Sequence, residues 1–164
     1  MNLESLLEFE TGKLLQQKGL HLALAESCTG GLVGYRVTNV PGSSEYLAGG
    51  LITYSYEAKV SMLGVAWDTL NTFGAVSRET VLEMARGAKK ELDTDIAVSI
   101  SGIAGPGGGT EDKPVGTTWV GLAAADGEWA REFHFQGDRV QNKESSADEA
   151  LRLLLDYLQG KLKK

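Results

Sequence analysis

The fold is decided at residues 21–32, which read HLALAESCTGGL. The apolar run 21–25 is short enough to be a buried strand. Gly30 and Gly31 then favour a tight turn, and the apolar residues of 32–37 recur at the spacing of a helix. A strand, a glycine turn and a helix in immediate succession predict an α/β protein, with ligand-binding groups at the turn.

The rest of the chain alternates in the same way. Helices are expected at 3–18, 57–63, 78–91 and 144–162, with a further turn from Asp68 to Phe73 and a cap at Ser77. Strands are expected at 48–54, 95–101, 115–125 and 129–135. The last two strands are separated by Asp126-Gly127, a strong hairpin signal. Because a hairpin is antiparallel and helical crossovers join parallel strands, we predict a mixed sheet in a single three-layer α/β/α domain over residues 1–164.

Composition excludes several function classes. The length of 164 residues fits one domain, and the apolar fraction of 42% is too high for a disordered chain. The net charge is −6, and the one basic cluster is the tail 161–164, so we expect no nucleic-acid partner. No stretch approaches about 18 apolar residues, so we expect no membrane span. The acidic, amphipathic N-terminus is unlike a signal peptide, and we therefore expect a cytoplasmic protein.

Glycine is the compositional outlier, and its clusters mark two candidate ligand loops. They are the turn 26–31 and the loop 101–110, and both are expected where a strand ends. The second loop does not complete G-x-G-x-x-G because Thr110 occupies the last position, and no Walker-type phosphate loop occurs. The glycines permit close approach of a ligand to backbone N–H groups, although tight turns alone would also need them.

Ser27 is the candidate nucleophile, because it lies between a buried strand and the start of a helix. The backbone N–H groups of Thr29, Gly30 and Gly31 are candidate donors to a developing oxyanion. Cys28 is an alternative nucleophile, since a helix N-terminus can lower the pKa of a thiol. Alternatively, Cys28 is a small buried side chain that only packs in the core.

The candidate general base is Lys59, because neither histidine suits the role. His21 and His134 are expected in strands as structural residues, and no metal-ligand spacing is present, so we expect no metal. A lysine acts as a base when desolvation lowers its pKa. Lys59 follows a predicted strand end and could point toward Ser27, with Tyr54 near enough to relay a proton. A surface lysine is the alternative at this position.

Six segments together resemble the C-terminal domain of the CinA family, which also occurs alone as nicotinamide-nucleotide amidase. They are AESCTGGL at 25–32, GGLITYSYEAK at 49–59, GAVS at 74–77, SGIAGPGGGT at 101–110, DKPVGT at 112–117 and F-x-G-D-R at 135–139. The resemblance extends over about residues 5–158. It implies a three-layer α/β/α fold with a mixed sheet, in agreement with the pattern of strands and helices.

The resemblance also implies an activity. The family hydrolyses the carboxamide of nicotinamide mononucleotide to nicotinate mononucleotide and ammonia, without a metal or other cofactor. Its serine falls on Ser27, its lysine on Lys59 and its tyrosine on Tyr54, which leaves Cys28 a packing role. A homodimer is also implied. Since the chain has no room for the molybdopterin-binding-like domain that often precedes this one, we expect the stand-alone form.

The nucleotide substrate is expected to lie along the second glycine loop. The expected contacts are with Ser101, Gly102, Gly105, Gly107 and Thr110, and with Arg139 at the phosphate. Two positions depart from the family pattern: Tyr56 stands where asparagine is frequent, and Lys143 where many members carry arginine. Lys143 can offer a phosphate a point charge but no bidentate contact. A non-catalytic nucleotide-binding module, an amidohydrolase using Cys28 and an enzyme for another amide are the competing hypotheses.

Overall fold

The structure, a computed structural model, describes residues 6–163. The helices are α1 (Leu7–Lys18), α2 (Leu32–Thr38), α3 (Tyr56–Leu63), α4 (Trp67–Phe73), α5 (Arg78–Glu91) and α6 (Arg139–Leu158), with a short 3₁₀ helix at Ser43–Glu45. The strands are β1 (Leu22–Glu26), β2 (Leu47–Ile52), β3 (Ile96–Gly102), β4 (Thr117–Ala124) and β5 (Gly127–His134). Residues 3–5 of the first predicted helix lie outside the described residues.

The five strands form one mixed sheet in the order β2-β1-β3-β4-β5. Strand β1 is parallel to both β2 and β3, whereas β4 is antiparallel to β3 and to β5. The predicted hairpin joins β4 to β5, with Ala124 paired to Gly127 across the turn. Because β1, β2 and β3 run in the same direction, their carboxyl ends meet at one edge of the sheet.

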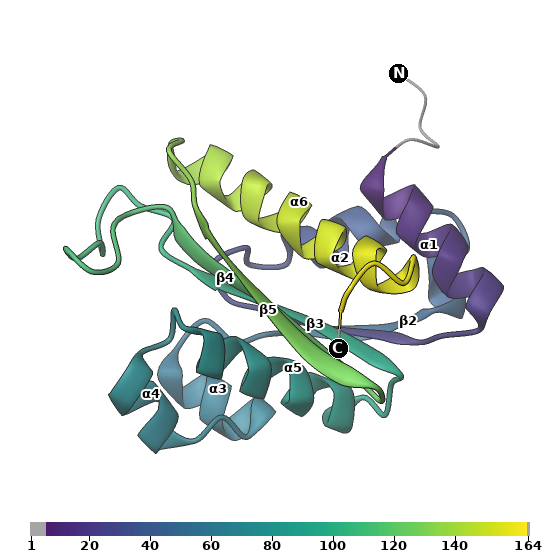
Figure 1. The fold of residues 1–164 in the computed structure, drawn as a ribbon, viewed down its shortest axis with the longest axis horizontal. Coiled ribbons are helices and arrows are strands. Elements are labelled where there is room, and N and C mark those ends of the chain that lie inside the picture. The colour runs from purple at the N-terminus through teal and green to yellow at the C-terminus, as the bar shows by residue number, and fades with distance from the viewer. Residues whose placement is uncertain (1–5, 164) are drawn as a thin grey trace.

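Helices cover both faces of the sheet, which confirms the three-layer α/β/α fold. Helices α1, α2 and α6 lie on one face, and α3, α4 and α5 lie on the other (Figure 1). Strand β1 contributes to both apolar layers, because Leu22 and Leu24 pack under the first set of helices and Ala23 and Ala25 under the second. This division follows from the strand geometry, in which successive side chains point to opposite faces.

Two predicted boundaries were wrong near the candidate site. Strand β2 ends at Ile52 instead of residue 54, so Thr53 and Tyr54 belong to the connection that leads to α3. Helix α6 begins at Arg139 instead of residue 144. Its start is set by a capping box, in which Asp138 accepts from the N–H of Gln141 and the side chain of Gln141 accepts from the N–H of Asp138.

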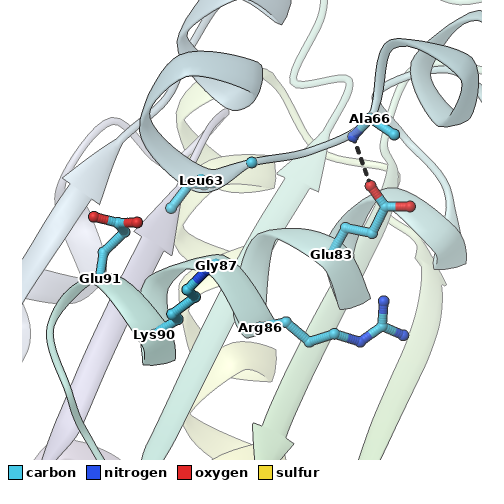
Figure 2. A pocket seen from close by; sticks show the side chains of 8 residues that line it. Leu63, Ala66, Glu83, Arg86, Gly87, Lys90 and Glu91 are labelled. Carbon is cyan, nitrogen blue, oxygen red and sulfur yellow. Dashed lines mark hydrogen bonds between the residues drawn. The ribbon is translucent and has the colours of Figure 1, made fainter.

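Helix α3 packs very closely on α5, and this contact positions the segment that carries Lys59. Leu63, the last residue of α3, lies directly over Gly87 of α5 (Figure 2). A methyl group at Gly87 would come within 2.7 Å of the carbonyl carbon of Leu63. Glycine is therefore needed at residue 87 for the two backbones to approach one another.

We predict that Gly87→Ala lowers the free energy of unfolding by about 2 kcal/mol, since overpacked sites typically cost 1–3 kcal/mol. Denaturant unfolding measures the change. Gly107→Ala is the matched control, because nothing lies within 4 Å of a methyl group at that position. Equal stability of the two variants would contradict the proposed role of the contact.

Candidate active site

Ser27 directly follows β1 at the carboxyl edge of the parallel strands. Its backbone N–H donates to the carbonyl oxygen of Ile100 in β3 at 3.0 Å, which fixes the start of the turn. The turn closes where the N–H of Gly30 donates to the carbonyl oxygen of Ser27, also at 3.0 Å. Gly30 and Gly31 have φ angles of 61° and 104°, and residues with a side chain rarely adopt such positive values. The chain can therefore reverse sharply and leave the Ser27 side chain at the edge of the core, 7% exposed.

Lys59 meets Ser27 directly, although 32 positions separate them in the sequence. Its Nζ atom lies 2.9 Å from Oγ of Ser27 and donates to the carbonyl oxygen of Thr53 at 2.7 Å. The Lys59 side chain is only 1% exposed, so the surface-lysine alternative is excluded. Ser55 caps the start of α3 by accepting from the N–H of Ala58, which fixes the first turn of the helix that carries Lys59.

Burial gives Lys59 the protonation behaviour of a base. Desolvation lowers the pKa of its amine from 10.5 to about 8, because the surrounding protein disfavours the charged form. A minority of the amine is then neutral near pH 7, and this neutral form, whose share grows as the pH approaches 8, can accept a proton from Ser27. A hydroxyl in contact with a neutral, water-excluded amine is the arrangement of an activated serine nucleophile.

Cys28 packs into the core and is poorly suited to nucleophilic chemistry. Its side chain belongs to the apolar cluster between the sheet and helices α1, α2 and α6. Burial raises the pKa of the thiol to about 11, so the reactive thiolate is scarce at neutral pH. The packing role is therefore favoured over the cysteine alternative.

Glu26 organises the turn, and our sequence analysis missed it. This buried carboxylate accepts from the hydroxyl of Thr29 at 2.7 Å and from the N–H groups of Val33 and Gly34 at 2.9 and 3.0 Å. It therefore holds both the turn and the first residues of α2. The available signal was an acidic residue at the end of an otherwise apolar strand, immediately before the glycine turn.

Two of the three predicted oxyanion donors keep an available N–H group. Among the backbone hydrogen bonds of residues 6–163, none occupies the N–H of Thr29 or Gly31. The N–H of Gly30 is already used within the turn, and this part of the prediction needs correction. The N–H groups of Val33 and Gly34 are also occupied by Glu26, so the donors available for an oxyanion lie in the turn itself.

Tyr54 lies on the outside of the site rather than between Ser27 and Lys59. Its side chain is 62% exposed, and its hydroxyl accepts from the guanidinium of Arg139 at 3.1 Å. Because Ser27 and Lys59 are in direct contact, a proton can pass between them without a relay. The structure thus places Tyr54 beside Arg139 at the rim, and the relay role of Tyr54 stays a prediction.

Arg139 connects the rim to the second glycine loop. Its guanidinium donates to the carbonyl oxygen of Gly105 at 2.7 Å, and the side-chain amide of Asn142 donates to the carbonyl oxygen of Ala104 at 3.1 Å. Both residues belong to the first turn of α6, so the early start of this helix positions the loop. Arg139 also borders a hollow of about 490 Å³ between the loop and the start of α6, with Pro106, Val115 and Val140 among its walls.

Only part of the loop 101–110 lies near the candidate nucleophile. Ser101 and Gly102 end β3 beside the turn, since the neighbouring Ile100 accepts from Ser27. Gly107 and Thr110 lie in the exposed outer part of the loop, which projects beyond the sheet (Figure 1). Thr110 closes a local turn there, with its hydroxyl accepting from the N–H of Lys113. The structure therefore does not bring Gly107 and Thr110 to Ser27 and Lys59.

Lys143 lies over the turn that follows Ser27. A methyl group at Gly30 would be 4.0 Å from Nζ of Lys143, so the amine lies directly above the glycine. Lys143 and Arg139 are four residues apart on α6 and therefore project from the same side of that helix. Together they place two positive charges beside the turn and the rim.

The hollow between α3 and α5 contains none of the predicted site residues. It has a volume of about 410 Å³ and is lined largely by charged side chains, including Glu83, Arg86 and Lys90 (Figure 2). Glu83 accepts there from the N–H of Ala66 at 2.8 Å. This hollow offers no nucleophile, so the chemistry is assigned to the turn.

The two histidines lie beside carboxylates, away from the Ser27 turn. His21 and His134 are half-exposed and lie near Asp95 and Glu132. Within residues 6–163, no group of three or more His, Cys, Asp and Glu side chains is placed to hold a metal ion. In that same part of the chain, no helix is both long and apolar enough to cross a bilayer.

Comparison with known proteins identifies the family. The family model described as "CinA C-terminal domain" matches residues 4–158. The chain belongs to the CinA C-terminal domain family. This CinA domain is 50% identical over 161 residues to a competence-damage inducible protein of Halothermothrix orenii, covering 98% of the chain and 39% of that protein. It is also 50% identical over 156 residues to a CinA-like protein of Chloroherpeton thalassium, covering 93% of the chain and 37% of the relative.

Solved structures share the fold of this CinA domain over nearly its whole length. A competence/damage inducible protein of Agrobacterium tumefaciens has a TM-score of 0.87 and 39% identity, covering 93% of this chain and 95% of that one. A CinA superfamily protein of Klebsiella pneumoniae has a TM-score of 0.90 and 32% identity, covering 94% and 96%. The chain thus matches these structures almost end to end, whereas it spans about two fifths of the curated relatives.

Proposed function

We propose that this CinA domain is a nicotinamide-nucleotide amidase that uses Ser27 as nucleophile and Lys59 as general base. The observation that carries the proposal is the 2.9 Å contact between Nζ of Lys59 and Oγ of Ser27 in a nearly closed site. The lowered pKa of Lys59 supports the same assignment, because only a neutral amine can accept the proton of the hydroxyl.

The proposed reaction proceeds through an acyl-enzyme. Oγ of Ser27 attacks the carboxamide carbon while its proton passes to Nζ of Lys59. The N–H groups of Thr29 and Gly31 stabilise the oxyanion, and one such donor typically contributes about 3–4 kcal/mol. The C–N bond then breaks as Lys59 returns the proton to the leaving nitrogen, which releases ammonia. Neutral Lys59 next activates a water molecule that hydrolyses the ester and restores Ser27.

The nucleotide substrate is supported by the charges around the turn. Arg139 at the rim and Lys143 above Gly30 supply the positive charge that a 5′-phosphate requires. Ser101, Gly102 and Gly105 form the part of the glycine loop that borders the same edge. The resemblance to the family's amidase names nicotinamide mononucleotide as the substrate that combines a carboxamide with such a phosphate.

Ammonia release from nicotinamide mononucleotide tests the proposal. We expect turnover by the wild type, and slower turnover of free nicotinamide, which lacks the phosphate. Cys28→Ser is expected to retain turnover, because the thiol takes no part in the reaction. Tight binding of the nucleotide without any release of ammonia would instead identify a non-catalytic nucleotide-binding module. If the protein released ammonia only from other amides, nicotinamide mononucleotide would be rejected as the substrate, but the amidase assignment would stand.

We also propose a cytoplasmic homodimer, which the resemblance to the family supports. Sedimentation equilibrium of the purified chain tests the oligomeric state. A monomer mass at micromolar concentration would contradict the dimer without affecting the assignment of Ser27 and Lys59.

A further inference from the structure

Thr53 carries an unexplained polar group beside the candidate catalytic pair. The residue is fully buried, and its hydroxyl oxygen Oγ1 has no hydrogen-bond partner in the described part of the chain. Most buried polar groups in folded proteins are hydrogen-bonded, and leaving one unpaired typically costs stability. The unpaired hydroxyl of Thr53 therefore lowers the stability of the fold unless it gains a partner during function.

The backbone of Thr53 is fixed between the nucleophile turn and the amine. Its N–H donates to the carbonyl oxygen of Glu26 at 2.9 Å, and its carbonyl oxygen accepts from Nζ of Lys59 at 2.7 Å. Only three atoms separate Oγ1 from that carbonyl oxygen along the residue. Rotation about χ1 can therefore move the hydroxyl relative to an amine that the carbonyl oxygen already holds.

A count of hydrogen-bond donors and acceptors shows that the Lys59 ammonium lacks one acceptor during the reaction. The ammonium has three N–H groups. The structure provides two oxygen partners, Oγ of Ser27 and the carbonyl oxygen of Thr53. Once the proton of Ser27 has moved to Nζ, and Oγ has bonded to the substrate carbon, the third N–H of the buried amine has no oxygen partner among the described residues. A buried charge with an unpaired donor is costly.

We propose that Thr53 is a positioning residue whose hydroxyl accepts the third N–H of the Lys59 ammonium formed during acylation. The inference rests on the proposed function, since it is the removal of the Ser27 proton that generates the ammonium in the reaction. In this arrangement Thr53 holds the charged base with two oxygens of one residue. In the structure the hydroxyl has no partner, so a rotation about χ1 must bring it to the ammonium.

Other charged and titratable groups surround the same turn and stay unchanged in the test. The Cys28 thiol is the group whose charge acts on Lys59, and Glu26 and Lys143 lie on the adjoining strand and helix. Thr53 itself does not ionise. A change in the titration of Lys59 on removal of the Thr53 hydroxyl thus reports the loss of one acceptor and not of a charge.

The test compares Thr53→Val, which replaces the hydroxyl by a methyl group of similar size, with Thr53→Ser, which keeps it. We expect Thr53→Val to reduce kcat for nicotinamide mononucleotide by about tenfold to a hundredfold, the effect of losing a hydrogen bond to a charged group. KM should change by less than about threefold, and the melting temperature should not fall. Thr53→Ser should retain kcat to within about threefold. Thr53→Ala provides a second hydroxyl-free variant if the valine does not fold.

A titration of Lys59 followed by ¹³C NMR separates failure of this inference from failure of the proposed function. The hydroxyl favours the ammonium, so its loss should lower the pKa of Lys59 in Thr53→Val and leave it unchanged in Thr53→Ser. This measurement needs no turnover and applies even if the wild type releases no ammonia. Unchanged kcat and unchanged titration in Thr53→Val would overturn the inference, as would equal losses in the valine and serine variants.

Discussion

Ser27→Ala is expected to reduce ammonia release from nicotinamide mononucleotide by about a thousandfold or more, because removal of a catalytic nucleophile typically has effects of this size. The loss should fall on kcat, since the contacts around Arg139 and Lys143 remain. The free energy of unfolding should fall by about 1–3 kcal/mol, because buried Lys59 loses Oγ of Ser27 as a partner, but the backbone bond to Ile100 is retained. A coupled assay for ammonia measures the effect, and thermal unfolding verifies the fold.

Cys28→Ser is the matched control for this nucleophile, because it changes the adjacent side chain of the same turn. If activity survives in Ser27→Ala and disappears in Cys28→Ser, the thiol is the nucleophile and the serine assignment is wrong. Mass spectrometry after a serine-directed acylating reagent gives a second readout, with the adduct expected on Ser27 in the wild type.

Lys59→Met is expected to reduce kcat by a factor similar to that of Ser27→Ala. The same substitution is expected to raise the free energy of unfolding at pH 7. Methionine has a length similar to that of lysine but cannot accept the proton of Ser27. At pH values where lysine is charged in both the folded and the unfolded protein, burying the charge lowers the free energy of unfolding. The difference between a pKa of about 8 in the folded protein and 10.5 in the unfolded chain corresponds to about 3 kcal/mol. Part of this gain is lost because the carbonyl oxygen of Thr53 loses its donor. We therefore expect a net increase of about 1–2 kcal/mol in the free energy of unfolding.

The stability difference should depend on pH in a defined direction. Below about pH 8 lysine is charged in the folded and unfolded states, so the full cost of burying the charge applies. Between about 8 and 10.5 the folded state loses the proton first, and the wild type gains stability relative to Lys59→Met. Urea unfolding at pH 7 and pH 10 measures the change. Lys90→Met, at an exposed position, should show no such dependence.

The activity of the wild type should follow the same ionisation. The neutral amine is the active form, so kcat/KM should rise with pH and level off above about pH 8. An acid limb that remains in Cys28→Ser supports the assignment to Lys59. A profile that is flat between pH 6 and 9 would contradict Lys59 as the base.

Local patterns along the chain were sufficient to predict the architecture and the position of the candidate nucleophile. The apolar run before the glycine turn predicted β1 and α2, and Asp126-Gly127 predicted the hairpin that makes the sheet mixed. Both patterns span only a few residues. Over that length, backbone sterics and the alternation of buried and exposed side chains determine the conformation. The capping box at Asp138 was also visible as D-x-x-Q, and its use would have corrected the start of α6.

The chemical environment of the site depended on contacts between distant segments. The segment that holds Lys59 resembles a surface helix in composition, yet α3 packs closely against α5 at Gly87 and the Lys59 amine is buried. Tyr54 was expected beside the pair because it is close in sequence, yet in the connection after β2 Thr53 is fully buried and Tyr54 is exposed. Desolvation, which lowers the pKa of Lys59, is a property of the surrounding volume and not of neighbours along the chain. It arises only when β1, the connection after β2, and α3 are brought together.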